Sequence, residues 1–246
     1  MQIPIIISLV LSATTLPSIS PTTQQELFQQ SNSISFFKSK NTLKSIYLQS
    51  NKNHTFYCGC SFDTNKQIDH DSCNYSPRIK SNKRSHRLEF EHIVPAHALG
   101  KNLQCWKEPI CSRRDGKKYK GRKCCSKVSD QFQQMQSDMH NLFPTVGEVN
   151  GDRFNFFFGE IYGEERKYGE CDFEVAERIA EPKKSIRGDI ARSYFYMSHQ
   201  YKMEIPDDYE ELLRGWHLSD PPDVWERDRN SLIEDVQGNR NPFIDY

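Results

Sequence analysis

The stretch LEFEHIVPAHALG, Leu88 to Gly100, combines a strand pattern with acid–base side chains. Apolar and charged residues alternate over residues 87–94, which predicts a β-strand that Pro95 ends. Glu91 and His92 stand at the end of this strand, where neighbouring side chains normally point to opposite faces. The two can serve one site only if the strand ends and twists there, as the proline indicates.

A zinc-peptidase arrangement is excluded by the spacing of the two histidines in this stretch. Such sites place two histidines on one helical face, at positions i and i+4. His92 and His97 are five residues apart with Pro95 between them. We therefore interpret His97 as a structural residue.

Positive charge is concentrated around this strand. The whole chain has 33 Lys/Arg and 33 Asp/Glu, but residues 78–127 hold about fifteen Lys/Arg against four Asp/Glu. Such a segment suits a polyanionic partner because neutralising phosphates releases counterions, although a solvated loop can have the same composition. Its candidates for bidentate phosphate contact include Arg113, Arg114 and Arg122.

A second group of polar residues lies in SDMHNLFPTVGEVNGDRFNF, residues 137–156. Thr145 and Glu148 have capping-box spacing, which predicts a helix that starts at Thr145 and continues through Asn150 into residues 156–158. The amide oxygen of Asn150 is a hard ligand suited to Mg²⁺, and a helix N-terminus favours a phosphate. This segment therefore contributes a candidate metal ligand.

The eight cysteines indicate a disulfide framework. The spacings Cys58-Gly59-Cys60 and Cys124-Cys125 lack the two-residue gap of knuckle-type zinc sites, and histidines at ligand spacing are missing. Disulfides are thus favoured over zinc, and their pairing stays open. An even cysteine count in a loop-rich chain is typical of exported proteins.

The N-terminus supports export as well. Residues 1–20 contain an apolar core of about ten residues, which predicts a signal peptide and is too short to span a bilayer. Residues 21–246 then form one domain of the α+β class, helix-rich, with a small antiparallel sheet and disulfide staples. We expect a short β-like segment over residues 55–58, a basic cysteine-bearing loop over residues 98–127, and helices over residues 37–48, 128–139, 185–203, 209–218 and 224–236.

Glu91 with His92, Asn150 and the basic segment together supply the parts of a metal-assisted phosphodiester hydrolase. A hard cation polarises the phosphate, a neutral histidine deprotonates water, and an arginine stabilises the developing charge. Each of these features, taken alone, fits a structural role equally well. His140 and Asn141, within the second motif, fit either the support of site residues or a structural pair, and the same holds for Asp152, Arg153 and Asn155.

Five segments in this order and spacing resemble the endonuclease I family: FEHIVPAHALG, Gln104-Cys105-Trp106, Gly121 to Cys124, the SDMHN…GEVNGDRFNF block and QGNRNPF at residues 237–243. The resemblance runs from about residue 57 to the C-terminus. Members of this family are secreted or periplasmic nucleases with a ββα-metal (His-Me finger) site and several disulfides. They cut DNA, and often RNA, with little sequence preference and leave 5′-phosphates.

The resemblance also implies roles for individual residues. His92 matches the general base that activates water, and Glu91 and Asn150 match the protein ligands of a single Mg²⁺, with Mn²⁺ or Ca²⁺ as alternatives. Arg122 matches the arginine that holds the scissile phosphate. The chain departs from the pattern at Gln136, where a glutamate is expected. This departure bears on rate or metal affinity and leaves the base and both ligands in place.

The sequence thus predicts a Mg²⁺-dependent non-specific endonuclease, periplasmic or extracellular and monomeric, whose partners are DNA and RNA contacted through their backbones. Two alternatives belong to other classes: a nucleic-acid-binding protein without catalysis, and a zinc-stapled structural module. The first would tolerate replacement of Glu91, His92 and Asn150. The second would release zinc, with free thiols, on denaturation.

Overall fold

The computed structural model describes residues 34–163 and 165–245, which belong to one compact unit. The fold is helix-rich with small sheets, which confirms the predicted α+β class. Residues 1–20, the expected signal peptide, lie outside the described residues, so that boundary stays a prediction. Within the described ranges, no helix has the length and apolar character needed to cross a bilayer.

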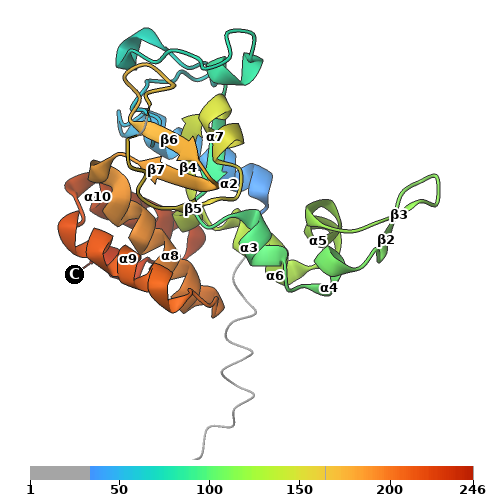
Figure 1. Ribbon diagram of the computed structural model, residues 1–246. Coiled ribbons are helices and arrows are strands. Elements are labelled where there is room, and N and C mark those ends of the chain that lie inside the picture. The colour runs from blue at the N-terminus through green and yellow to red at the C-terminus, as the bar shows by residue number, and fades with distance from the viewer. Residues whose placement is uncertain (1–33, 164, 246) are drawn as a thin grey trace, which may run out of the picture. The chain divides into compact units, whose positions relative to one another are not determined.

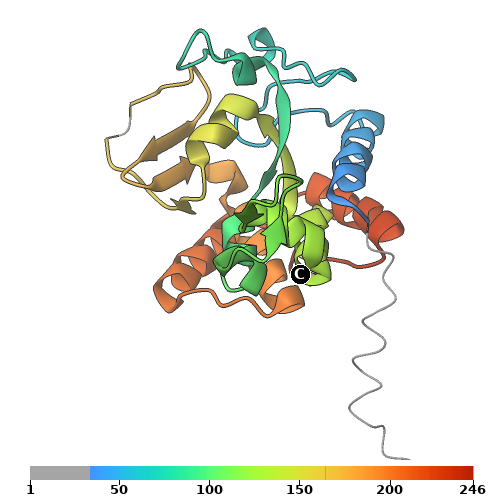
Figure 2. The same cartoon turned by 90° about the vertical axis from the view of Figure 1, so that its right-hand side faces the viewer.

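The site is built on an antiparallel strand pair and the helix that follows it. Strand β1 (Leu88–His92) pairs with β4 (Leu142–Val146), and α7 (Gly147–Arg153) begins directly after β4 (Figures 1 and 2). In the register of this pair, Leu88 lies opposite Val146 and His92 opposite Leu142. The predicted strand is therefore confirmed, and its last residue is the histidine of the opening motif.

The predicted capping box at Thr145 is wrong. Thr145 is a strand residue opposite Glu89, and α7 begins at Gly147 without a side-chain cap. Glu148 cannot close a capping box because its carboxylate accepts a hydrogen bond from the Tyr75 hydroxyl at 2.6 Å and others from the loop that follows Tyr75. Long-range pairing has overridden the local pattern.

The basic, cysteine-bearing segment is more ordered than the predicted loop. It contains three short helices and a hairpin. Helix α6 (Asp130–Ser137) follows it and confirms the helix expected over residues 128–139. Figure 1 shows the hairpin at the tip of an arm that projects away from the central strands. The elements that precede α6 are α3 (Ala96–Gly100), α4 (Gln104–Lys107), β2 (Cys111–Ser112), β3 (Lys118–Tyr119) and α5 (Arg122–Val128).

A three-stranded sheet was not predicted. Strand β5 (Phe157–Phe158) pairs in parallel with β7 (Ile179–Pro182), which pairs antiparallel with β6 (Phe173–Ala176). Because α7 ends at Arg153, the expected continuation of the helix through residues 156–158 is wrong. These strands are too short for a period-two pattern to stand out.

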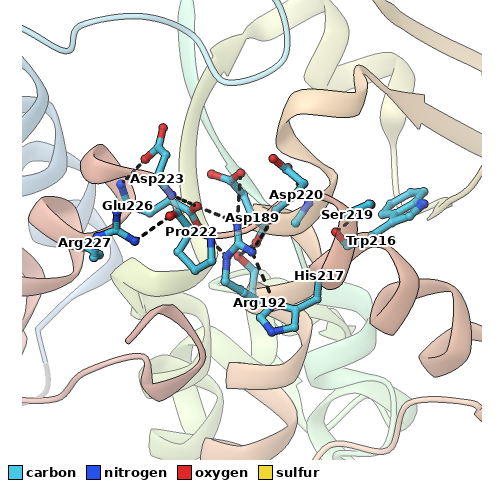
Figure 3. Close-up of polar contacts among 12 residues, drawn as sticks. Asp189, Arg192, Trp216, His217, Ser219, Asp220, Pro222, Asp223, Glu226 and Arg227 are labelled. Atoms are coloured by element: carbon cyan, nitrogen blue, oxygen red, sulfur yellow. Dashed lines mark hydrogen bonds and ion pairs between the residues drawn. The ribbon is translucent and has the colours of Figure 1, made fainter. Parts of the chain in front are cut away.

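The C-terminal helices were predicted and are present: α8 (Arg187–Tyr201), α9 (Asp207–Ser219) and α10 (Val224–Gln237). The side chain of Arg192 on α8 is only 1% exposed. It donates to both carboxylate oxygens of Glu226 at 2.7 and 2.6 Å and to the main-chain oxygen of Asp220 at 2.7 Å (Figure 3). This arginine joins α8 to the end of α9 and the start of α10.

The N-terminal helix and the cysteines complete the fold. Helix α2 (Phe36–Gln49) confirms the helix expected over residues 37–48. The β-like segment over residues 55–58 is wrong: the chain turns there, and the Gly59 N–H donates to the Thr55 oxygen at 2.7 Å. All eight cysteines form disulfides, as predicted, in the pairs Cys58–Cys171, Cys60–Cys73, Cys105–Cys125 and Cys111–Cys124.

Candidate active site

Glu91 and His92 line one cavity of about 1340 Å³, together with Asn150, Arg122 and others named below. We call it the central cavity. Both residues lie at the end of β1 and are nearly buried, at 3% and 6% exposure. Adjacent strand residues normally face apart, so the end of the strand before Pro95 is what allows both to reach this cavity. All four candidate site residues are therefore brought together.

His92 is held as a neutral ring with one free nitrogen. Its Nε2 lies 2.8 Å from the main-chain oxygen of Gln136, and because a carbonyl can only accept, Nε2 carries the proton. The other nitrogen, Nδ1, has no hydrogen-bond partner among the described residues. Burial lowers the pKa of His92 to about 3, and the positive charge of Arg122 acts in the same direction. The geometry and the charge state both suit a general base.

The ring of His92 is covered on one side by an aromatic residue of α2. Phe36 stacks on it with 5.1 Å between ring centroids and 28° between planes. The Lys40 ammonium lies 4.4 Å from the centre of the Phe36 ring and the Arg122 guanidinium 5.3 Å from it. The first helix of the described chain thus contributes an apolar wall and an extra cation to the cavity.

Glu91 has one engaged and one unengaged oxygen. Its Oε1 accepts from Arg153 at 2.8 Å and from the Tyr57 hydroxyl at 3.3 Å. No donor within the described residues contacts Oε2. Burial raises the pKa of Glu91 to about 7 and outweighs the opposing charge of Arg153. A cation in the cavity would favour the ionised form.

Asn150 is oriented by a neighbouring carboxylate. Its Nδ2 donates to Oε2 of Glu89 at 2.8 Å, and Glu89 is itself held by hydrogen bonds from Arg84 and Arg87. The amide oxygen is thereby left without a donor among the described residues. The sequence argument did not identify Glu89, although it stands two residues before Glu91 on the same strand.

Arg153 is the principal supporting residue that the sequence argument left as structural or functional. Its side chain is 1% exposed and donates to Glu91, to the His92 oxygen at 2.9 Å and to the Ile93 oxygen at 2.7 Å. It lies three residues after Asn150, which places both on one side of α7. One guanidinium therefore fixes the helix that carries Asn150 to the strand end that carries His92.

The three candidate arginines of the basic segment separate into two groups. Arg122, at the start of α5, lines the central cavity, is exposed, and has no hydrogen bond or ion pair to any described residue. Arg113 and Arg114 lie on the β2–β3 hairpin and do not line this cavity. Of these three arginines, only Arg122 lines the cavity that contains His92.

The remaining polar residues of the motifs have structural partners. The Asn141 amide bonds both backbone groups of Val94, at 2.7 and 3.0 Å, and so extends the strand pair past its last residue. His140 Nε2 bonds the Asn239 oxygen at 3.0 Å. His97 is exposed at the rim of the cavity and makes an edge contact with Trp106.

The donor set fits a hydrated hard cation. The unengaged oxygens of Glu91 and Asn150 are a carboxylate and an amide, which Mg²⁺ accepts while it retains several waters. Across residues 34–163 and 165–245, no group of three or more His, Cys, Asp or Glu residues is arranged to hold a metal. The disulfides also engage every cysteine, so a structural zinc site would have no cysteine ligands.

The chain is similar to known proteins over most of its length. The family model described as Endonuclease I matches residues 18–246. A periplasmic deoxyribonuclease of Aeromonas hydrophila is 44% identical over 197 residues, which covers 78% of each chain. Endonuclease-1 of Buchnera aphidicola (subsp. Acyrthosiphon pisum) is 35% identical, covering 88% of this chain and 86% of that protein. An extracellular ribonuclease of Bacillus subtilis is 33% identical over 128 residues, 45% of this chain and 44% of its own.

Proposed function

Because the chain belongs to the endonuclease I family, we propose that this endonuclease hydrolyses phosphodiester bonds of DNA and RNA outside the cytoplasm, without sequence preference, and leaves 5′-phosphates. The relatives cited above carry the names periplasmic deoxyribonuclease, endonuclease and extracellular ribonuclease, which supports both the substrate class and the compartment. The four disulfides support an oxidising compartment. We infer that the protein acts as a monomer.

One observation carries this proposal: a buried, neutral histidine that is anchored through Nε2 and presents Nδ1 without a partner among residues 34–163 and 165–245. In the proposed reaction, Nδ1 of His92 takes a proton from the attacking water. The Gln136 oxygen holds the ring in the tautomer that makes this transfer available, and it is a main-chain atom that any residue at position 136 supplies. Replacement of a glutamate by Gln136 therefore leaves this contact in place.

The other residues act on the phosphate. Glu91 and Asn150 would hold Mg²⁺ through their unengaged oxygens, and the ion, when bound, supplies Lewis-acid stabilisation of the phosphate and the leaving oxygen. The Arg122 guanidinium contacts the scissile phosphate and stabilises its developing charge. Phe36 limits the access of bulk water to one side of the His92 ring.

The test is cleavage of plasmid DNA and of RNA by the oxidised protein with Mg²⁺, Mn²⁺ or Ca²⁺, and with EDTA. We expect cleavage with Mg²⁺ and none with EDTA. His92→Ala should lower the rate by about 10²- to 10⁴-fold, which is the usual cost of removing a general base. End-labelling of the products should reveal 5′-phosphates.

His97→Ala is the matched control because it removes the other histidine at the same cavity. It should retain activity within about an order of magnitude, since its ring has no proposed role in proton transfer. Full activity of His92→Ala would overturn the mechanism. Binding of DNA without cleavage under every metal would instead indicate a non-catalytic nucleic-acid-binding protein.

A further inference from the structure

We propose that Phe154 forms a nucleobase-stacking subsite at the central cavity, where its ring contacts a base next to the scissile phosphate. The inference rests on the proposed function, because it assigns a substrate contact at the same site. It goes beyond that function by naming a residue that binds the base rather than the phosphate. Three features of Phe154 carry it: its exposure, its backbone conformation and its fixed position.

The first feature is an exposed aromatic ring at the wall of the site. Phe154 is 67% exposed and lines the cavity that also contains His92, Asn150 and Arg122. Most phenylalanines of the described chain are in or against the core, so exposure of this one is not a consequence of composition. An exposed aromatic face at a nucleic-acid site is a stacking surface for bases.

The second feature is a backbone conformation that a phenylalanine adopts at a cost. Phe154 has φ 54° and ψ −117°, directly after the last residue of α7. The Phe156 N–H donates to the Arg153 oxygen at 3.2 Å, so residues 153–156 make a tight turn with Phe154 at a position that favours glycine. Burial of the ring does not offset this strain. Strained residues of this kind concentrate where a side chain is needed for binding.

The third feature is that the turn is fixed to the catalytic strand. Arg153, its first residue, bonds the main-chain oxygens of His92 and Ile93. On the other side, the ring of Phe156 supports that of Phe154, with 5.6 Å between centroids and 60° between planes. The turn that carries Phe154 is therefore fixed relative to His92 by the short, buried hydrogen bonds of Arg153.

These features assign complementary tasks to the residues around the cavity. Arg122 and Lys40 are cations suited to the sugar–phosphate backbone, whereas Phe154 is an apolar surface suited to a base. Every base has an aromatic face, so stacking on Phe154 is compatible with cleavage that ignores sequence. It favours strands whose bases can unstack, which includes single-stranded DNA and RNA.

The experiment compares His92→Ala with the double variant His92→Ala/Phe154→Gly, so that binding is measured without cleavage. The probes are a fluorescein-labelled oligothymidylate and an abasic oligomer of the same length and charge, both with Mg²⁺, followed by fluorescence anisotropy. We expect Phe154→Gly to raise the Kd for oligothymidylate by about 5- to 150-fold, the usual range for one stacked base. The Kd for the abasic oligomer should change by less than about twofold.

Glycine is chosen because it separates binding from folding. Phe154→Gly relieves the left-handed φ and should raise the Tm by about 2–4 °C, whereas loss of a structural phenylalanine would lower it. Phe154→Trp should keep the affinity for oligothymidylate. The matched control is Phe157→Ala, because Phe157 is 54% exposed on the same short segment but lies outside the cavity, against Tyr209.

The outcomes separate this inference from the proposed function. If the wild type fails to cleave DNA with Mg²⁺, the proposed function fails first. If it cleaves as expected and Phe154→Gly weakens both oligomers equally, or neither, the stacking subsite is overturned while the nuclease assignment stands. An equal loss in Phe157→Ala would also overturn it, since any exposed aromatic ring would then have the same effect.

Discussion

Two regions meet at the central cavity and are held together in different ways. The strand pair β1–β4 and the helix α7 are stabilised by buried polar side chains such as Arg153 and Asn141. The arm over residues 104–128 has almost no core: its only buried side chains are four cysteines, Cys105, Cys111, Cys124 and Cys125. Two disulfides among those four hold the arm.

The difference follows from what each region contributes. The proposed proton transfer from water to His92 requires atomic placement, and a rigid, hydrogen-bonded core provides that placement. Charge attraction acts over several ångströms, so the lysines and arginines of the arm do not need the same precision. A cationic surface held by disulfides is sufficient for the second task. Arg122 stands where the two regions join.

The largest expected effect comes from two arginines, one from each region. Arg153→Ala should lower the free energy of unfolding by about 3–5 kcal/mol, because it leaves the Glu91 carboxylate buried without its cation. It should also abolish measurable cleavage, since β1 and α7 lose their common anchor. Chemical denaturation and a plasmid assay measure the two effects.

Arg122→Ala provides the contrast. Because Arg122 is exposed and unpaired among the described residues, its loss should change the free energy of unfolding by less than about 0.5 kcal/mol. Its rate should still fall by about 10- to 1000-fold if it stabilises the phosphate. Equal destabilisation by the two variants would remove the distinction between the regions.

A second prediction concerns acid stability in the metal-free protein. The pKa of His92 is lowered to about 3 in the folded state, so the unfolded chain binds the extra proton first as the pH falls from about 6.5. The His92 contribution therefore lowers the free energy of unfolding as the pH falls from about 6.5 to 3. Glu91 has a raised pKa of about 7, so its contribution has the opposite sign, and stability falls as pH rises from about 4.5 to 7.

Removal of the histidine should separate the contribution of His92 to the pH dependence of stability from that of Glu91. His92→Asn should flatten the acid side of the stability curve by a few kcal/mol between pH 6.5 and about 3, while the decline toward pH 7 from Glu91 remains. His97→Asn is the control at an exposed position. A wild-type curve whose acid side matches that of His92→Asn would show that His92 is not held neutral by the fold.

The parts of this molecule that could be predicted from sequence are those with local signals. Residues 87–94 alternate, the segments that form α8 and α10 are long enough and rich enough in helix-forming residues to be expected as helices, and Glu91 and His92 are adjacent in the chain. The structure brings these two together with Asn150 and Arg122, and the chemical roles of all four stay predictions. The disulfides followed from the number and spacing of the cysteines.

The parts that could not be predicted depend on distant partners. Thr145 and Glu148 have the spacing of a capping box, but each has a distant partner instead. Thr145 pairs with β1, and Glu148 accepts a hydrogen bond from the Tyr75 hydroxyl. Phe36 lies far from His92 in sequence, so no local pattern reports its stacking. The position of Phe154 depends on a turn conformation that sequence favours for glycine, and only coordinates reveal it.

The smallest expected contrast is between two disulfides that close loops of equal length. Cys111–Cys124 in the arm and Cys60–Cys73 outside it each span 13 residues, so chain entropy alone predicts the same loss for each, roughly 3 kcal/mol. Cys60 stands between the buried residues Tyr57 and Phe62, so replacement of that pair by serines should have the full cost. Replacement of the arm pair should cost about 1 kcal/mol, because the arm buries no side chains other than its four cysteines and the hairpin can then open without unfolding the rest.

Nucleic-acid binding should show the reverse order. In the His92→Ala background, a protein without Cys111–Cys124 should no longer hold Arg113 and Arg114 together. The magnitude of the slope of log K against log salt should then decrease by about 1–2, as expected for the loss of one or two phosphate contacts. Loss of Cys60–Cys73 should leave that slope unchanged. Titrations of labelled DNA at several salt concentrations measure it. If both pairs alter stability equally and neither alters the slope, the arm is held by its own packing and does not deliver charge to the substrate, and the contrast between the two regions fails.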